Sequence, residues 1–108
     1  MKRILFVCSR NRWRSPTAEE IFASHPGVET ASAGTAPDAD NPLSAELVEW
    51  ADLIVAMEPA HLRRIKAGFG RHIGSVRTVS LNIPDKYRYM DEKLVEILRE
   101  RMRPHLPD

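Results

Sequence analysis

Short apolar segments alternate along the chain with segments whose apolar residues recur at helical spacing. The first apolar segment, residues 4–7, reads Ile-Leu-Phe-Val without a polar interruption, which is typical of a strand buried on both faces of a parallel sheet. Residues 52–57 contain a similar run, and residues 28–32 and 76–81 carry several β-branched side chains. The pattern therefore predicts four strands, one in each of these segments.

Four amphipathic segments separate or follow the predicted strands. Leu43, Leu47 and Trp50 occupy one helix face. Ser15 can cap the first helix, and Pro16 suits its first turn. The expected helices run from Ser15 to about His25, from Asn41 to about Ala51, from Pro59 to about Gly68, and from a cap at Asp91 to a stop at Pro104.

The order of these elements is a regular alternation of strand and helix. It predicts an α/β fold, a four-stranded parallel sheet with helices on both faces. With 108 residues and no repeat or linker, residues 1–108 are expected to form a single domain. Ligands of such sheets bind outside the carboxyl ends of the strands. The segment after the first strand, which begins at Cys8, is therefore the first candidate site.

Composition excludes several classes of protein. Hydrophobic residues make up 43% of the chain and charged residues 29%, as in ordinary folded domains. No apolar run approaches the roughly 18 residues of a membrane helix, and no signal peptide is recognisable, so we expect a cytoplasmic protein without membrane contact. One cysteine and four scattered histidines provide no metal-ligand spacing, so we expect no metal and no cofactor.

The formal net charge is only +1, but the charges are distributed in blocks. Residues 1–14 and residues 61–77 carry basic and no acidic side chains, whereas residues 15–60 carry acidic and no basic ones. The 61–77 block is either a solvated face or a surface for an anionic partner such as nucleic acid. The first block surrounds the only cysteine with arginines.

That cysteine opens a loop between the first strand and the first helix. This Cys8 loop (residues 8–15) reads Cys-Ser-Arg-Asn-Arg-Trp-Arg-Ser. Successive N–H groups of a tight loop form a concave nest, and the following helix N-terminus adds partial positive charge, so a phosphate or a thiolate is stabilised there. The thiolate is the nucleophilic form of cysteine. The alternative is a buried core cysteine beside a solvated arginine cluster.

Each side chain of the Cys8 loop has an expected role in phosphate chemistry. Cys8 is the expected nucleophile, and Arg14 can bind two phosphoryl oxygens in a fork. Ser15 can donate its hydroxyl to the sulfur. The expected phosphate-binding residues are Ser9, Arg10, Asn11, Arg12, Trp13 and Ser15.

Short motifs in and beyond this loop resemble the low-molecular-weight protein-tyrosine phosphatase family. They are residues 4–8, Asn11, Arg14-Ser15-Pro16, Ala18-Glu19, Ser32-Ala33-Gly34-Thr35 and residues 51–57. The resemblance implies a flavodoxin-like three-layer fold and metal-independent hydrolysis of phosphomonoesters through a phosphocysteine. It also implies that Asn11 and Ser32 support the Cys8 loop by hydrogen bonds.

The chain departs from that family at several positions. Trp13 stands where a second cysteine is common, so no disulfide can protect Cys8. Arg10 replaces a common glycine, and Arg12 replaces an apolar residue at the pocket rim. An arginine there favours additional anionic charge or a planar group on the substrate. The chain is also shorter than typical members, with a gap expected between Thr35 and the third strand.

The reaction also needs a general acid for the leaving group. The family places it in an Asp-Pro pair that is followed by an aromatic residue, after the fourth strand. The corresponding segment here is Pro84-Asp85-Lys86-Tyr87, and we expect Asp85 to be the acid, with Asp91 as the rival. Tyr87 and Tyr89 are expected to form walls of the pocket.

The resulting hypothesis is a cysteine-dependent phosphatase, with a phosphotyrosine protein as the first substrate choice. A nucleotide, an RNA end or another small phosphomonoester is the second. Arsenate reduction on the same fold relays through further cysteines, which this chain lacks. A non-enzymatic phosphate-binding module is the remaining alternative, and it requires Asp85 to lie far from Cys8. Oligomeric state is not determined by the sequence.

Overall fold

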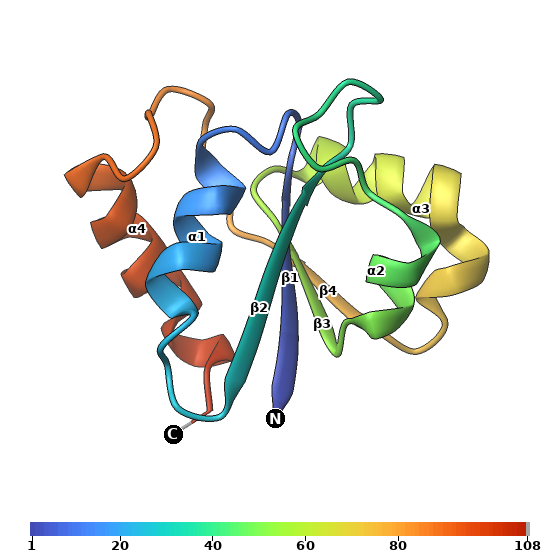
Figure 1. Ribbon diagram of the computed structural model, residues 1–108, viewed down its shortest axis with the longest axis horizontal. Helices are drawn as coiled ribbons and strands as arrows, with labels where there is room; N and C mark the ends of the chain where they lie inside the picture. Colours follow the sequence, from blue (N-terminus) through green and yellow to red (C-terminus); the bar gives the residue numbers. More distant parts are fainter. Residues whose placement is uncertain (108) are drawn as a thin grey trace.

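The computed structural model describes residues 1–107, which form one parallel sheet in the order β2-β1-β3-β4 (Figure 1). The strands are β1 (Lys2–Cys8), β2 (Val28–Gly34), β3 (Leu53–Ala56) and β4 (Arg77–Ser80). All three neighbouring pairs are parallel. The predicted fold class and the four predicted strands are confirmed.

Two helices cover each face of the sheet, as predicted. Figure 1 shows α1 (Arg14–Phe22) and α4 (Glu92–Met102) on one side, and α2 (Ala45–Trp50) and α3 (Pro59–Ile73) on the other. A short 3-10 turn, Arg103–His105, follows α4. Within residues 1–107, the helices are too short or too polar to cross a membrane.

Strand β1 divides the core into two halves because its side chains alternate between the faces of the sheet. Ile4, Phe6 and Cys8 are buried on the α1 and α4 side, and Leu5 and Val7 on the α2 and α3 side. The first half also contains Ala18, Phe22, Leu94, Leu98 and Met102, and the second contains Ala33, Val48, Ile54 and Ile65. Cys8 is the last residue of β1, an inner strand, so it lies at the carboxyl edge of the sheet.

Residues 35–40, which follow β2, run beside the Cys8 loop and bond to its backbone. The carbonyl oxygens of Cys8, Ser9 and Arg10 accept hydrogen bonds of 2.9, 2.9 and 3.1 Å from the N–H groups of residues 35, 36 and 40. Gly34 permits this approach, since a Cβ atom there would lie 2.5 Å from the Ala39 Cβ and 2.6 Å from the Ser9 carbonyl oxygen. The two segments are thus in direct backbone contact.

Two helix starts differ from the prediction. Trp13, not Ser15, is the N-cap residue of α1, and no side chain caps that helix. The second helix begins at Ala45 with Ser44 as its cap. Its predicted cap, Asn41, instead donates its side-chain amide to the Ser32 carbonyl oxygen. In both cases a tertiary hydrogen bond uses a side chain that local sequence assigns to a cap.

Helix α3 is longer than predicted. The helix continues past Gly68 to Ile73, and the glycine-flanked Phe69 has φ −133° and ψ 21°, which makes a kink rather than an end. Gly74, with φ +55°, terminates the helix. Asp91 caps α4 as predicted, since its side chain accepts from the Lys93 N–H group.

We expect Gly34→Ala to lower the free energy of unfolding by about 1–3 kcal/mol, because the new methyl group meets backbone atoms that cannot move independently. Gly68→Ala is the matched control, since a Cβ atom added there would meet no other atom within 4 Å, and a helical alanine is favoured by about 0.5–1 kcal/mol. Urea unfolding of both variants measures the difference. Equal stability of the two variants would contradict the close packing at Gly34.

Candidate active site

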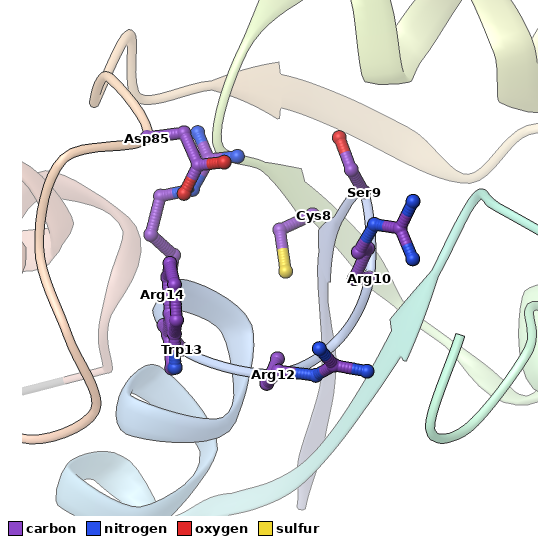
Figure 2. A pocket seen from close by; sticks show the side chains of 7 residues that line it. All are labelled: Cys8, Ser9, Arg10, Arg12, Trp13, Arg14 and Asp85. Carbon is purple, nitrogen blue, oxygen red and sulfur yellow. The ribbon is translucent and has the colours of Figure 1, made fainter. Parts of the chain in front are cut away.

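A pocket of about 300 Å³ opens at the carboxyl edge of the sheet, around the Cys8 sulfur (Figure 2). Its lining comes from the end of β1, the Cys8 loop, the start of α1 and the loop between β4 and α4. The lining residues are Cys8, Ser9, Arg10, Arg12, Trp13, Arg14 and Asp85. The structure therefore brings the expected nucleophile, the expected phosphate-binding arginine and the expected acid into one cavity.

The backbone of the Cys8 loop has the shape of an anion nest. Its carbonyl oxygens at positions 8, 9 and 10 are bonded outward to residues 35–40, which leaves the N–H groups to face the opposite way. Asn11 adopts a left-handed conformation, with φ 55°, which asparagine tolerates better than most residues. Alternation of right- and left-handed residues turns successive N–H groups toward one point. That arrangement suits an oxyanion.

A buried chain of hydrogen bonds leads from Asn11 to the sulfur. The Asn11 Nδ2 atom donates to Ser15 Oγ at 2.9 Å, and Ser15 Oγ lies 2.9 Å from Cys8 Sγ. Because Asn11 supplies the hydrogen of the first bond, the Ser15 hydroxyl can donate to the sulfur, with the Ala33 carbonyl oxygen at 3.4 Å as its more distant alternative. Ser15 thus faces the nucleophile, which explains why it does not cap α1.

Arg14 is buried at the side of the pocket, with 2% of its side chain exposed. Its Nη1 atom donates to Glu58 Oε2 at 2.7 Å and to the Ile83 carbonyl oxygen at 2.8 Å. Its Nε atom lies 3.6 Å from Asp85 Oδ1. A buried guanidinium needs such partners, since an unpaired charge is costly to bury. The bonds of Nη1 also fix the orientation of the guanidinium plane.

Glu58 and His61 are site residues that sequence analysis did not identify. Glu58 directly precedes the expected start of the third helix at Pro59, and its carboxylate binds Arg14. His61 is buried, and its ring contacts Ser9 of the pocket at 3.0 Å. The available signal was positional, because both residues follow β3 at the carboxyl edge of the sheet.

The rim arginines are paired with the acidic residues of the segment that follows β2. Arg10 lies 3.0 Å from Asp38, and Arg12 lies 3.6 Å from Asp40. All four side chains are more than half exposed, so each pair contributes little to stability. Their charges still offset each other at the mouth of the pocket.

Three expectations about supporting residues are wrong. The Ser32 hydroxyl donates to the Glu19 carboxylate and not to the Cys8 loop. Tyr87 packs against the hydrophobic core and Tyr89 is half-exposed, so neither lines the pocket. Trp13 provides the aromatic surface there instead. The loop that carries both tyrosines is also bonded to α1, because the Met90 N–H group donates to Thr17.

The two candidate acids occupy different places. Asp85 lines the pocket with 55% of its side chain exposed, whereas Asp91 is engaged as the N-cap of α4.

Among residues 1–107, no group of three or more histidine, cysteine or carboxylate side chains is placed to hold a metal ion. The basic side chains Arg63, Arg64 and Lys66 of the 61–77 block are exposed on α3.

The chain is similar to known phosphatases. No protein-family model matches it. A protein-arginine-phosphatase of Bacillus subtilis (strain 168) is 28% identical over 138 aligned positions, which cover 90% of this chain and 92% of that protein. The crystal structure of the tyrosine phosphatase Wzb from Escherichia coli K30, in complex with phosphate, is 25% identical with a TM-score of 0.77, and the match covers 96% of this chain and 95% of that one.

A low-molecular-weight protein tyrosine phosphatase from Streptococcus pyogenes has a TM-score of 0.79 over 98% of this chain and 91% of its own. Its sequence identity is 18%, so this likeness concerns the fold alone.

We expect Ser15→Ala to slow alkylation of Cys8 by iodoacetate about tenfold near pH 6, because the ionised sulfur loses a hydroxyl donor. Ser32→Ala is the matched control, since that hydroxyl bonds to Glu19 away from the sulfur, and its alkylation rate should stay within twofold of the wild-type rate. Mass spectrometry of the modified cysteine gives both rates. An unchanged rate in Ser15→Ala would show that the hydroxyl donates elsewhere.

Proposed function

We propose that this chain, which is similar to a protein-arginine-phosphatase and to the tyrosine phosphatase Wzb, is a member of the low-molecular-weight protein-tyrosine phosphatase family and hydrolyses phosphorylated protein side chains through a phosphocysteine formed on Cys8. The observation that carries the proposal is the convergence of three groups in one pocket: the lone sulfur, a buried guanidinium and a half-exposed carboxylate. Each group corresponds to one requirement of metal-independent phosphoryl transfer.

In the first step, the Cys8 thiolate attacks phosphorus in line with the leaving oxygen. A sulfur–phosphorus bond forms and the phosphorus–oxygen bond to the leaving group breaks. Arg14 and the inward-facing N–H groups of the Cys8 loop stabilise the equatorial oxygens of a loose transition state. Because Glu58 and the Ile83 carbonyl hold Nη1, the guanidinium is oriented before substrate arrives.

Asp85 serves both halves of the reaction. It gives its proton to the leaving oxygen in the first step, and in the second step it takes a proton from the water that attacks phosphorus. The new phosphorus–oxygen bond then replaces the phosphorus–sulfur bond, and phosphate is released. The sulfur leaves as a thiolate, to which the Ser15 hydroxyl, 2.9 Å away, donates.

Phosphotyrosine in proteins is the first substrate choice. The likeness to the tyrosine phosphatase Wzb supports it, and so does the Trp13 ring at the pocket, since aromatic rings pack favourably against one another. The likeness to a protein-arginine-phosphatase adds phosphoarginine to the substrates worth assaying.

A small or nucleotide phosphomonoester is the second candidate. It is favoured by the arginines at the pocket rim, Arg10 and Arg12, since an arginine suits additional anionic charge on the substrate. A non-enzymatic binding module is disfavoured, because it needs Asp85 to lie far from Cys8, and both line the same pocket. A lone nucleophilic thiol suits a reducing compartment, which supports a cytoplasmic location.

We expect Cys8→Ser to reduce turnover of an aryl phosphate below detection, because the hydroxyl is a far weaker nucleophile. The variant should still bind vanadate, since the nest and Arg14 remain. Steady-state assays of the wild type on phosphotyrosine peptide, phosphoarginine peptide and nucleoside monophosphates, each repeated with Cys8→Ser, assign the substrate. Wild-type turnover in Cys8→Ser would contradict the proposed nucleophile.

We expect Asp85→Asn to lower kcat/KM, which reports the first step, at least a hundredfold for aryl phosphates with poor leaving groups, and less than tenfold for nitrophenyl phosphate, which needs little protonation. Asp91→Asn is the matched control, because asparagine also caps helices well, and its kcat/KM should equal that of the wild type. A series of substituted phenyl phosphates makes the measurement. The opposite ranking of the two variants would assign the acid to Asp91.

A further inference from the structure

His61 is a buried polar residue to which the mechanism above gives no role. It is the third residue of α3, and only 3% of it is exposed. Both ring nitrogens make hydrogen bonds, Nδ1 with the Glu58 N–H group and Nε2 with Ser9 Oγ, each at 3.0 Å. The ring therefore connects the start of α3 to the pocket.

The tautomer of the ring follows from its partners. A backbone N–H group can only donate, so Nδ1 accepts from Glu58 and carries no proton. Burial, together with the positive charge of Arg14, lowers the pKa of His61 to about 4, so the ring is neutral near pH 7 and the 3.9 Å approach of Nε2 to the Glu58 carboxylate is not an ion pair. The single ring proton is on Nε2.

The proton on Nε2 determines what the Ser9 hydroxyl can do. Nε2 donates to Ser9 Oγ, so the oxygen accepts this bond and its own hydrogen is free to be donated elsewhere. Among residues 1–107, that hydroxyl has no hydrogen-bond partner other than His61. Ser9 lines the pocket directly beside Cys8 (Figure 2).

We propose that Ser9 contacts the substrate, donating its hydroxyl to an oxygen of the bound phosphoryl group, and that His61 is the residue that positions it. This inference rests on the proposed function of the same pocket. It adds a side-chain donor to the N–H groups of the Cys8 loop and to Arg14. No covalent step is involved.

The connection to Glu58 explains why a histidine is suited to this position. Glu58 holds the His61 ring with its backbone N–H group and holds Arg14 with its carboxylate. The Ser9 hydroxyl and the Arg14 guanidinium are therefore anchored to the same residue. Donors that are oriented before binding need no reorganisation when the substrate arrives.

The test compares Ser9→Ala with Ser9→Thr, which keeps the hydroxyl. Two quantities are measured, the inhibition constant of inorganic phosphate and kcat/KM for nitrophenyl phosphate. Ser9→Ala should weaken phosphate binding and lower kcat/KM about tenfold, because a hydrogen bond to a charged oxygen is lost, and Ser9→Thr should recover most of both. If Ser9→Ala leaves both within twofold of the wild type, Ser9 only satisfies the buried ring and the inference is wrong.

His61→Asn tests the positioning role. Its side-chain oxygen can still accept from the Glu58 N–H group, but the shorter side chain does not reach Ser9. We expect the loss seen in Ser9→Ala, and no further loss in the double variant. Additive losses would overturn the role of His61. Should His61→Asn fail to fold, the two Ser9 variants still decide whether the hydroxyl contacts the phosphoryl group.

The outcome is separable from that of the proposed function. A wild-type protein that binds phosphate without hydrolysing esters would disprove the function, and the phosphate affinities of the Ser9 variants would still test the contact. A functioning enzyme that is indifferent to Ser9→Ala would disprove only the contact.

Discussion

The outward hydrogen bonds of the Cys8 loop carbonyls to residues 35–40 are the constraint on which the site depends. A peptide group points its C=O and N–H in opposite directions, so fixing the carbonyls on one side commits the N–H groups to the other. The loop can then direct backbone donors toward the pocket around the sulfur. Gly34 makes this possible, because any larger residue would separate the two segments.

The acidic residues around Arg14 allow a positively charged side chain to be buried beside the pocket. A guanidinium that is 2% exposed would destabilise the protein if it were unpaired. Glu58 and Asp85 supply negative charge, but only Asp85 lines the cavity. Glu58 is thus a structural counterion, whereas Asp85 stands between Arg14 and the space that a substrate occupies. At the rim, Asp38 and Asp40 moderate the two remaining arginines.

The sequence was informative where a pattern is local. Apolar runs marked β1 and β3, and β-branched residues marked β2 and β4. The spacing from Cys8 to Arg14, together with the alternation of elements, predicted a site at the carboxyl edge of the sheet, where the structure has a pocket. It was misleading where one side chain had two suitable partners. Ser15 and Asn41 both look like helix caps, but the fold gives Ser15 to the sulfur and Asn41 to β2.

Other features depend on distant parts of the chain and leave no local signal. Glu58 and His61 acquire their contacts only when β3 and β1 become neighbours. The loop that carries Tyr87 and Tyr89 is bonded to α1, a contact that no pattern within residues 82–90 encodes.

Trp13 gives the site an optical property of its own. The chain has two tryptophans, and Trp13 lines the pocket while Trp50 packs against the opposite half of the core. The indole of Trp13 also has the Arg88 guanidinium 6.0 Å from its ring centre. Its emission is therefore sensitive to the polarity and charge of the cavity, against a constant background from Trp50. Occupancy can be followed by intrinsic fluorescence, without a label and without turnover.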